Sequence, residues 1–418
     1  MAIGTKRTCR LVPPMSAFGG KADAPHGVFY EYTPYLNETA RLIVGVAGMV
    51  KQNEAAIELW RQIFATLANA EDATLVDADY NPTEDEARFR EGFAQAGWSE
   101  EETQFRLDLL RKQEAGAPVT SPGVSRHVEF LFGLLCDDIE AAMERLHIES
   151  HGRVARGIEP RAGPLAANTN VVMTNEGIIT VGSFLFRFCG LIARAFTRTL
   201  HRAPTFWESA NYSHDLARAY VRDDPKLVAY WLRIFLSFST TGTHVMVPFQ
   251  PAKRHELVVF EQVARAMEIF AIAHEYGHHH LDHGRRIEDD PKLDEFSADQ
   301  FALKISYEVE RKPILMPNPY LSSGAGGVIL LLALEMLNGI REVITRISIA
   351  PSVTHPDVDA RLLQFDSVSV LKPQEFVALR AFRIASTRIM KTVQSVLLEL
   401  TNAMPPDAHK LLRALSEA

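Results

Sequence analysis

Hydrophobic residues recur at every third or fourth position along most of this chain, which is the spacing of an amphipathic helix. The first such segment runs from Leu36 to Ala70. The same spacing returns later in the chain, at 100–114, 127–147, 205–238, 326–345 and 374–415. We therefore expect a helical N-terminal region over 28–150 and C-terminal helices over 371–418. Residues 1–27 are small, polar and rich in proline and glycine, which predicts a disordered tail.

A different pattern occupies Asn170 to Leu185. Apolar residues on either side of the segment 174–177 predict a β-hairpin with Gly177 at its turn. We expect another short strand over 243–249. The stretch 148–168 is rich in Gly, Pro, Arg and His and is interpreted as a linker. Together these patterns predict an α+β fold that is predominantly helical and contains a small sheet.

One helical stripe leads into a pair of histidines, His274 and His278. Its apolar residues step at i+3 and i+4 through Phe260, Val263, Met267 and Phe270. On a helix, positions i and i+4 share a face, so the two imidazoles can offer nitrogens to one metal ion. Glu275 follows the first histidine and is placed to act as general base on a metal-bound water. The pattern predicts a buried zinc site on this helix.

The alternative is a histidine-rich helix end that merely exposes His279, His280 and His283. A second acidic segment, Asp294 to Ala302, favours the metal site. It follows a predicted helix start, with Asp290 as N-cap and Pro291 at the first helical position.

Within that segment Glu295 and Asp299 are spaced i, i+4 and share one helical face. Glu295 is the expected third zinc ligand, because two histidines and one carboxylate leave the fourth zinc position open. Asp299 is expected to accept the spare N–H of a ligating histidine and fix its orientation.

Other third ligands can be tested by their spacing. The metzincin pattern requires a third histidine where this chain has Gly284. His283 lies about 140° further round a continuous helix than His278, so it should point away from the metal unless the helix ends early. Asp282 is on the same helical face as His278 and stays as a rival to Glu295.

Composition narrows the class of protein. The chain has 418 residues and a formal net charge of −8, which argues against nonspecific binding to nucleic acid or to an anionic membrane surface. The widely separated Cys9, Cys136 and Cys189 predict no disulfide framework and fit a reducing, cytoplasmic setting. Neither a secretory signal nor a membrane span is expected. The best candidate span, Gly326 to Leu334, is far shorter than the ~20 residues that cross a bilayer. Nothing in the pattern sets the oligomeric state.

The two motifs together carry a family resemblance. His-Glu-Tyr-Gly-His at 274–278, followed by Glu-Phe-Ser-Ala-Asp at 295–299, resembles the gluzincin zinc metallopeptidases. The segments Asn170–Leu185 and Ser352–Pro356 with Arg361 look like the hairpin and the His-Pro segment of the HtpX/CAAX-prenyl-endopeptidase type. The histidine run is also similar to the phage-exclusion peptidase Lit and its soluble relatives. Unlike the membrane-bound type, this chain has no flanking transmembrane helices. The resemblance covers about 170–370 and implies a zincin-like metallopeptidase core over 165–370.

The resemblance implies a zinc-dependent endopeptidase that acts on an intracellular protein or peptide. Zinc lowers the pKa of its bound water to about 7. Glu275 would take the proton of that water and pass it to the leaving amine. His355 is the candidate second donor to the oxyanion, although it could instead only cap the helix after Pro356. Arg361 could pair with a carboxylate and hold this segment in place.

Two other functions stay open. One is a zinc-bearing regulatory or interaction protein on a peptidase fold, which the intact Glu275 disfavours because such a protein needs no base. The other is a toxin or phage-defence effector, which shares the peptidase chemistry and differs in its biology.

Overall fold

A computed structural model of the protein describes residues 54–69, 82–116, 121, 124–149, 153–171, 174–283, 290–310, 317–347, 355–367 and 373–417. Over these residues the fold is predominantly helical with one three-stranded sheet, as the hydrophobic pattern predicts. The expected tail over 1–27 lies outside the described residues. The predicted domain boundaries stay predictions.

The helices before the sheet are α2 (Glu54–Ala68), α3 (Pro82–Gln95), α4 (Glu100–Gly116) and α5 (Arg126–Arg145). Those that follow it are α6 (Leu185–Arg202), α7 (His214–Arg222), α8 (Pro225–Thr241), α9 (Leu257–His280), α10 (Pro291–Glu310), α11 (Pro319–Ser322), α12 (Ala325–Thr345), α13 (Val358–Ser367), α14 (Pro373–Asn402) and α15 (Pro406–Glu417). The predicted C-terminal helical segment is therefore two helices, α14 and α15. It breaks before Pro406, where proline favours a helix start over a helix interior.

The sheet consists of β1 (Val154–Glu159), β2 (Ala166–Asn170) and β3 (Gly177–Gly182). Its order is β1-β3-β2, with β1 parallel and β2 antiparallel to β3. A hairpin of β2 and β3 is therefore present, but its first strand begins earlier than expected, and Gly177 pairs with Asn170 as the first residue of β3 instead of lying at the turn.

Two further sequence expectations near the sheet are wrong. The stretch 148–168 contains β1 and the start of β2 and is not a linker. Of its glycines, Gly157 is needed for packing, because a Cβ there would lie 2.2 Å from Cε2 of Trp60 on α2. The expected strand over 243–249 is a series of turns. The backbone N–H of Met246 donates to Ser237 Oγ at 3.1 Å, so this segment folds back on the end of α8.

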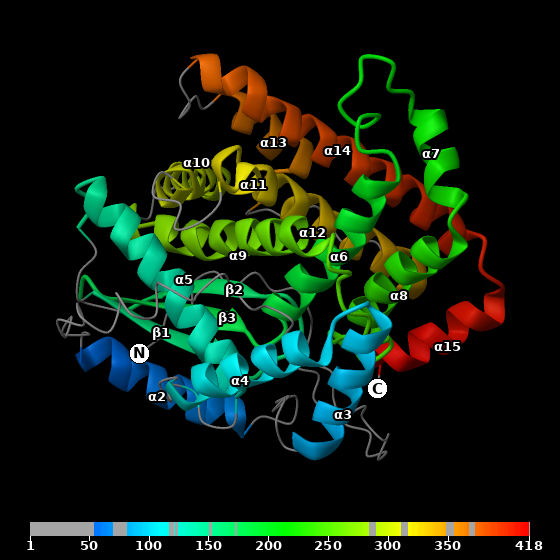
Figure 1. The fold of residues 1–418 in the computed structure, drawn as a ribbon. Helices are drawn as coiled ribbons and strands as arrows, with labels where there is room; N and C mark the ends of the chain where they lie inside the picture. The colour runs from blue at the N-terminus through cyan, green and yellow to red at the C-terminus, as the bar shows by residue number, and fades with distance from the viewer. Residues whose placement is uncertain are drawn as a thin grey trace.

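The long helix α9 lies at the centre of the molecule (Figure 1). One side of it covers the sheet, while α10 and α12 cover its other side, and α2 packs on the opposite face of the sheet (Figure 1). The larger of two hydrophobic clusters among the described residues extends from Ala56 on α2 to Leu397 on α14. The C-terminal part of α9 is thus held on several sides, which suits a helix that carries a site.

Gly326 to Leu334 lies within α12 and is buried in this cluster. Over the described part of the chain, no helix has both the length and the apolar character needed to cross a membrane.

Candidate metal centre

Helix α9 buries the stripe that the sequence predicts. Phe260, Val263, Met267 and Phe270 are all at most 2% exposed. His274 continues this face and is itself buried, whereas His278, one turn later, is half-buried. The two motif histidines therefore lie where α9 passes from the hydrophobic core to the protein surface.

Helix α10 brings the acidic residues to α9. Asp290 Oδ1 accepts the backbone N–H of Lys292 at 2.9 Å, which confirms the predicted N-cap, and Pro291 opens the helix. Close approach of the two helices depends on Gly277, where a Cβ would lie 3.1 Å from Cα of Ala298. Because of this contact Glu295, one turn before Ala298, can reach the histidines of α9.

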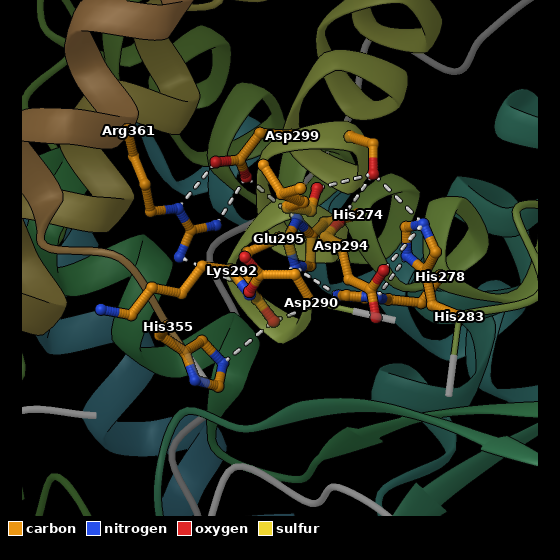
Figure 2. A network of polar contacts seen from close by, with 12 residues as sticks. His274, His278, His283, Asp290, Lys292, Asp294, Glu295, Asp299, His355 and Arg361 are labelled. Atoms are coloured by element: carbon orange, nitrogen blue, oxygen red, sulfur yellow. Dashed lines mark hydrogen bonds and ion pairs between the residues drawn. The ribbon is translucent and has the colours of Figure 1, made fainter. Parts of the chain in front are cut away.

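Three donor atoms form a small triangle (Figure 2). His274 Nε2 and His278 Nε2 are 3.0 Å apart. Glu295 Oε2 lies 3.4 Å from His274 Nε2, and Glu295 Oε1 lies 3.5 Å from His278 Nε2; one donor atom from each of the three residues lies within 4.8 Å of the other two. Ligands about 2.0–2.1 Å from a tetrahedral zinc ion are separated by roughly 3.3 Å. The triangle therefore fits a metal of this size, and these three residues are the group that could hold one among the described residues.

The charges at the triangle suit a cation. Burial opposes ionisation of Glu295, but hydrogen bonds with His274 and His278 and nearby positive charge hold its pKa well below the usual range. Burial also lowers the pKa of His274, yet its hydrogen bonds to Asp299 and Glu295 raise that pKa to about 10. Without a metal, a proton on His274 and the guanidinium of Arg361 together balance the carboxylates of Glu295 and Asp299.

The outer nitrogen of His274 faces an anionic partner. Nδ1 lies 3.0 Å from Asp299 Oδ1. Arg361, on α13, donates to both oxygens of Asp299 at 2.5 and 2.7 Å. Asp299 and Arg361 are both buried, and the charge of Arg361 lowers the pKa of Asp299 against the effect of burial. Asp299 thus lies where the sequence predicts an orienting carboxylate, and Arg361 has the predicted acidic partner.

The outer nitrogen of His278 faces a different partner, His283, at 2.9 Å between the two Nδ1 atoms. The helix ends early, which is the condition that the sequence analysis left open for His283. Helix α9 ends at His280, and Asp282 adopts the left-handed conformation at φ 55°, so the chain turns back instead of continuing round the helix. His283 is nevertheless outside the ligand triangle, as is Asp282.

Glu275 lies beside the triangle without belonging to it. Burial raises its pKa, while the charges of His274 and His278 and the backbone N–H of Asn168 favour its ionised form. A raised pKa suits a group that must take up a proton near neutral pH. Asn168 belongs to β2, so the carboxylate of Glu275 is in contact with the edge of the sheet.

His355 lies on the other side of Glu295 (Figure 2), and its Nε2 is 3.2 Å from Glu295 Oε1. Burial lowers the pKa of His355. The alternative that His355 caps the next helix is wrong, because Asp357 is the cap of α13 and accepts the N–H of Ala360 at 2.7 Å. The preceding residues Ser352 to Thr354 lie outside the described residues.

Behind the site, a buried network that the sequence did not reveal fixes α9. Tyr276 Oη donates to Glu140 of α5 at 2.6 Å, and Arg156 of β1 is 2.9 Å from the same carboxylate. His279, expected to be exposed if the histidines were only a helix end, is buried against Gly177 of β3, where a Cβ would lie 2.4 Å from its Nδ1. A tyrosine inside the motif was the one available signal, since its hydroxyl needs a partner when buried.

Comparisons with protein families, curated proteins and solved structures find no match for this chain.

Proposed function

We propose that this protein is a zinc-dependent endopeptidase of the gluzincin type with a zincin-like core. The observation that carries the proposal is the position of Glu275. It is a carboxylate outside the metal-ligand triangle, next to both ligating histidines and in contact with the sheet edge. A purely structural zinc site has four protein ligands and no need of such a group.

The donor set of two imidazoles and one carboxylate fits zinc and leaves one position open. When bound, the metal supplies Lewis acidity and makes a water molecule acidic near neutral pH. Glu275 removes the proton of the attacking water and delivers it to the leaving amine. His355, whose Nε2 lies 3.2 Å from Glu295 Oε1, would donate to the developing oxyanion.

The outer edge of β2, which pairs with no further strand among the described residues, supports an extended peptide as substrate. Leu165 and Val171 turn their backbone groups toward β3, because the Leu165 carbonyl accepts from Gly182 at 2.8 Å and the Val171 N–H donates to Glu176 at 2.9 Å. The alternating positions on β2, including Asn168, therefore turn their backbone groups away from β3 and toward Glu275. A peptide added as a strand along this edge would pass the triangle and the base.

The decisive experiment compares the wild type with Glu275→Gln. The wild type should bind about one zinc per chain and cleave protein substrates that are identified by mapping new termini across a proteome. Glu275→Gln should keep the metal and lose cleavage by about 10²–10⁴-fold. His274→Ala is the matched control and should lose both.

Each outcome of this comparison assigns a function class. Full cleavage by Glu275→Gln would remove the proposed base. Zinc binding with no cleavage by the wild type would favour a regulatory or interaction protein that uses the site for stability. Cleavage confined to a single host protein would favour a toxin or phage-defence effector with the same chemistry.

A further inference from the structure

The residue His283 is tied to the metal centre at several atoms. Its backbone N–H donates to the His278 carbonyl at 3.0 Å, and its own carbonyl accepts from Asn170 Nδ2 at 3.0 Å. Its Nδ1 is 2.9 Å from His278 Nδ1, and its Nε2 is 3.1 Å from Ser297 Oγ. These contacts join the end of α9 to β2 and α10 and hold the imidazole in one orientation (Figure 2).

The protons along this line can be assigned in one way when His278 Nε2 coordinates a metal. A neutral imidazole that binds through Nε2 carries its proton on Nδ1. His278 Nδ1–H must then donate, so His283 Nδ1 accepts and carries no proton. The proton of a neutral His283 consequently lies on Nε2, which faces Ser297 Oγ.

Ser297 completes this assignment as an acceptor. Its hydroxyl donates to the backbone carbonyl of Leu293 at 2.9 Å, which leaves its lone pairs for the N–H of His283. Asp294 Oδ1, 3.8 Å from His283 Nε2, places a carboxylate near the same proton. In this assignment the N–H of His278 donates to His283, and the N–H of His283 donates to Ser297, so each donor has an acceptor while His278 Nε2 binds the metal.

We propose that His283 is a positioning residue of the metal centre: its Nδ1 accepts a hydrogen bond from Nδ1–H of His278 and so directs the lone pair of His278 Nε2 toward the metal. This inference rests on the proposed metal site. It assigns His283 a role outside the ligand set. Metal-bound histidines are commonly oriented by such an acceptor, whose loss weakens metal binding by about 10–100-fold.

The turn after α9 explains how a residue so close in sequence can fill this role. The N–H of His283 bonds to the carbonyl of His278, and the N–H of Asp282 bonds to that of His279 at 3.2 Å. These are the two hydrogen bonds of a Schellman cap. The cap reverses the chain at Asp282 and brings the imidazole of His283 back against the outer edge of His278.

The test compares zinc affinity in three variants, measured by competition with a chromophoric chelator. His283→Leu removes the acceptor and should weaken zinc binding by about 10–100-fold. His283→Asn places Oδ1 near the position of Nδ1 and should stay close to the wild-type affinity. His280→Leu, an exposed histidine at the same helix end, is the matched control and should bind like the wild type.

A second measurement uses the wild type and does not depend on a variant folding. The ¹⁵N imidazole spectrum of the zinc-loaded protein should show His283 with its proton on Nε2 and a bare Nδ1. The opposite tautomer, or unchanged zinc affinity in His283→Leu, would overturn the inference. Equal weakening in His283→Leu and His283→Asn would assign the effect to packing and also overturn it. A wild type that binds no zinc would overturn the proposed function together with the role of His283. A wild type that binds zinc, with unchanged affinity in His283→Leu, would overturn only the role of His283.

Discussion

His274 and His278 are one turn apart on α9, yet their outer nitrogens meet opposite kinds of partner. His274 faces the carboxylate of Asp299, which accepts hydrogen bonds from Nε and Nη2 of Arg361. His278 faces His283, a neutral acceptor that leads to Ser297. We refer to these as the anionic branch (Asp299, Arg361) and the neutral branch (His283, Ser297).

The two branches differ in what they stabilise. The anionic branch is buried and joins α9, α10 and α13, so it contributes to the fold as well as to the site. The neutral branch is local and half-buried, and it joins the end of α9 to the start of α10. Charge-assisted hydrogen bonds are roughly twice as strong as neutral ones. The anionic branch should therefore matter more for stability, whereas the neutral branch should matter mainly for the metal.

The largest effect is expected when the anionic branch is broken. Asp299→Leu leaves the buried guanidinium of Arg361 to the more distant carboxylate of Glu295, at 3.6 Å, and should cost about 3 kcal/mol of unfolding free energy. Urea unfolding of the metal-free protein measures this loss. The double variant Asp299→Leu/Arg361→Met removes both charges and should recover most of the stability.

The same double variant separates fold from site. Its zinc affinity should stay low, because His274 Nδ1 still has no acceptor. Recovery of stability together with full zinc affinity would show that Asp299 acts only through the fold. His283→Leu is the comparison from the neutral branch and should leave the urea midpoint far less changed.

The next largest effect concerns His355, which lies beyond Glu295 on the side of the anionic branch. If it donates to the oxyanion, His355→Ala should lower kcat by about 10²–10³-fold while zinc content stays normal. Because Asp357 caps α13, the thermal midpoint should hardly change. Unchanged kcat in this variant would remove His355 from the catalytic groups.

A third prediction uses pH to separate the branches. The folded pKa of His274, about 10, exceeds its ordinary value of 6.5 because Asp299 and Glu295 outweigh the effect of burial. Its contribution to metal-free stability is therefore fully present below pH 6.5 and is lost as pH rises through about 10. Zinc must displace this proton, so zinc affinity should rise about tenfold per pH unit across that window.

Calorimetry in buffers of different ionisation enthalpy should detect release of about one proton on zinc binding at neutral pH. Asp299→Asn removes one of the two carboxylates that raise the pKa of His274 and should narrow the pH range over which zinc affinity rises. An unchanged range in Asp299→Asn would assign the released proton to another group.

The contrast between the branches also shows what the sequence could predict. Glu295 and Asp299 could be placed from their spacing, because both lie well inside one helix where i, i+4 positions share a face. Asp290 and Pro291 mark the start of that helix, and the structure agrees. The predominantly helical fold follows from the same periodicity.

The sequence left open where α9 ends, and with it the position of His283, because periodicity alone does not fix the end of a helix. The wrong predictions concern the sheet. Strand β1 was missed because its Arg156 and Gly157 are favoured by contacts with Glu140 and Trp60, which are distant in sequence. Such pairings are set by tertiary packing and leave no periodic pattern in a single segment.

The smallest expected effect concerns Asp282, on which the neutral branch turns. Its φ of 55° is a conformation that glycine adopts freely and that costs other residues about 1–2 kcal/mol. Asp282→Gly removes this cost but adds freedom to the unfolded chain, so it should stabilise the protein by at most about 1 kcal/mol and leave zinc affinity unchanged.

Asp282→Val should lower both the stability and the zinc affinity, because a β-branched residue resists this conformation and would displace His283. Weaker zinc binding in Asp282→Val, with the urea midpoint and zinc affinity of Asp282→Gly preserved, would show that the turn supports the site through His283. If Asp282→Val binds zinc as tightly as the wild type, the cap does not determine the position of His283, and the neutral branch depends on Ser297 and Asn170 alone.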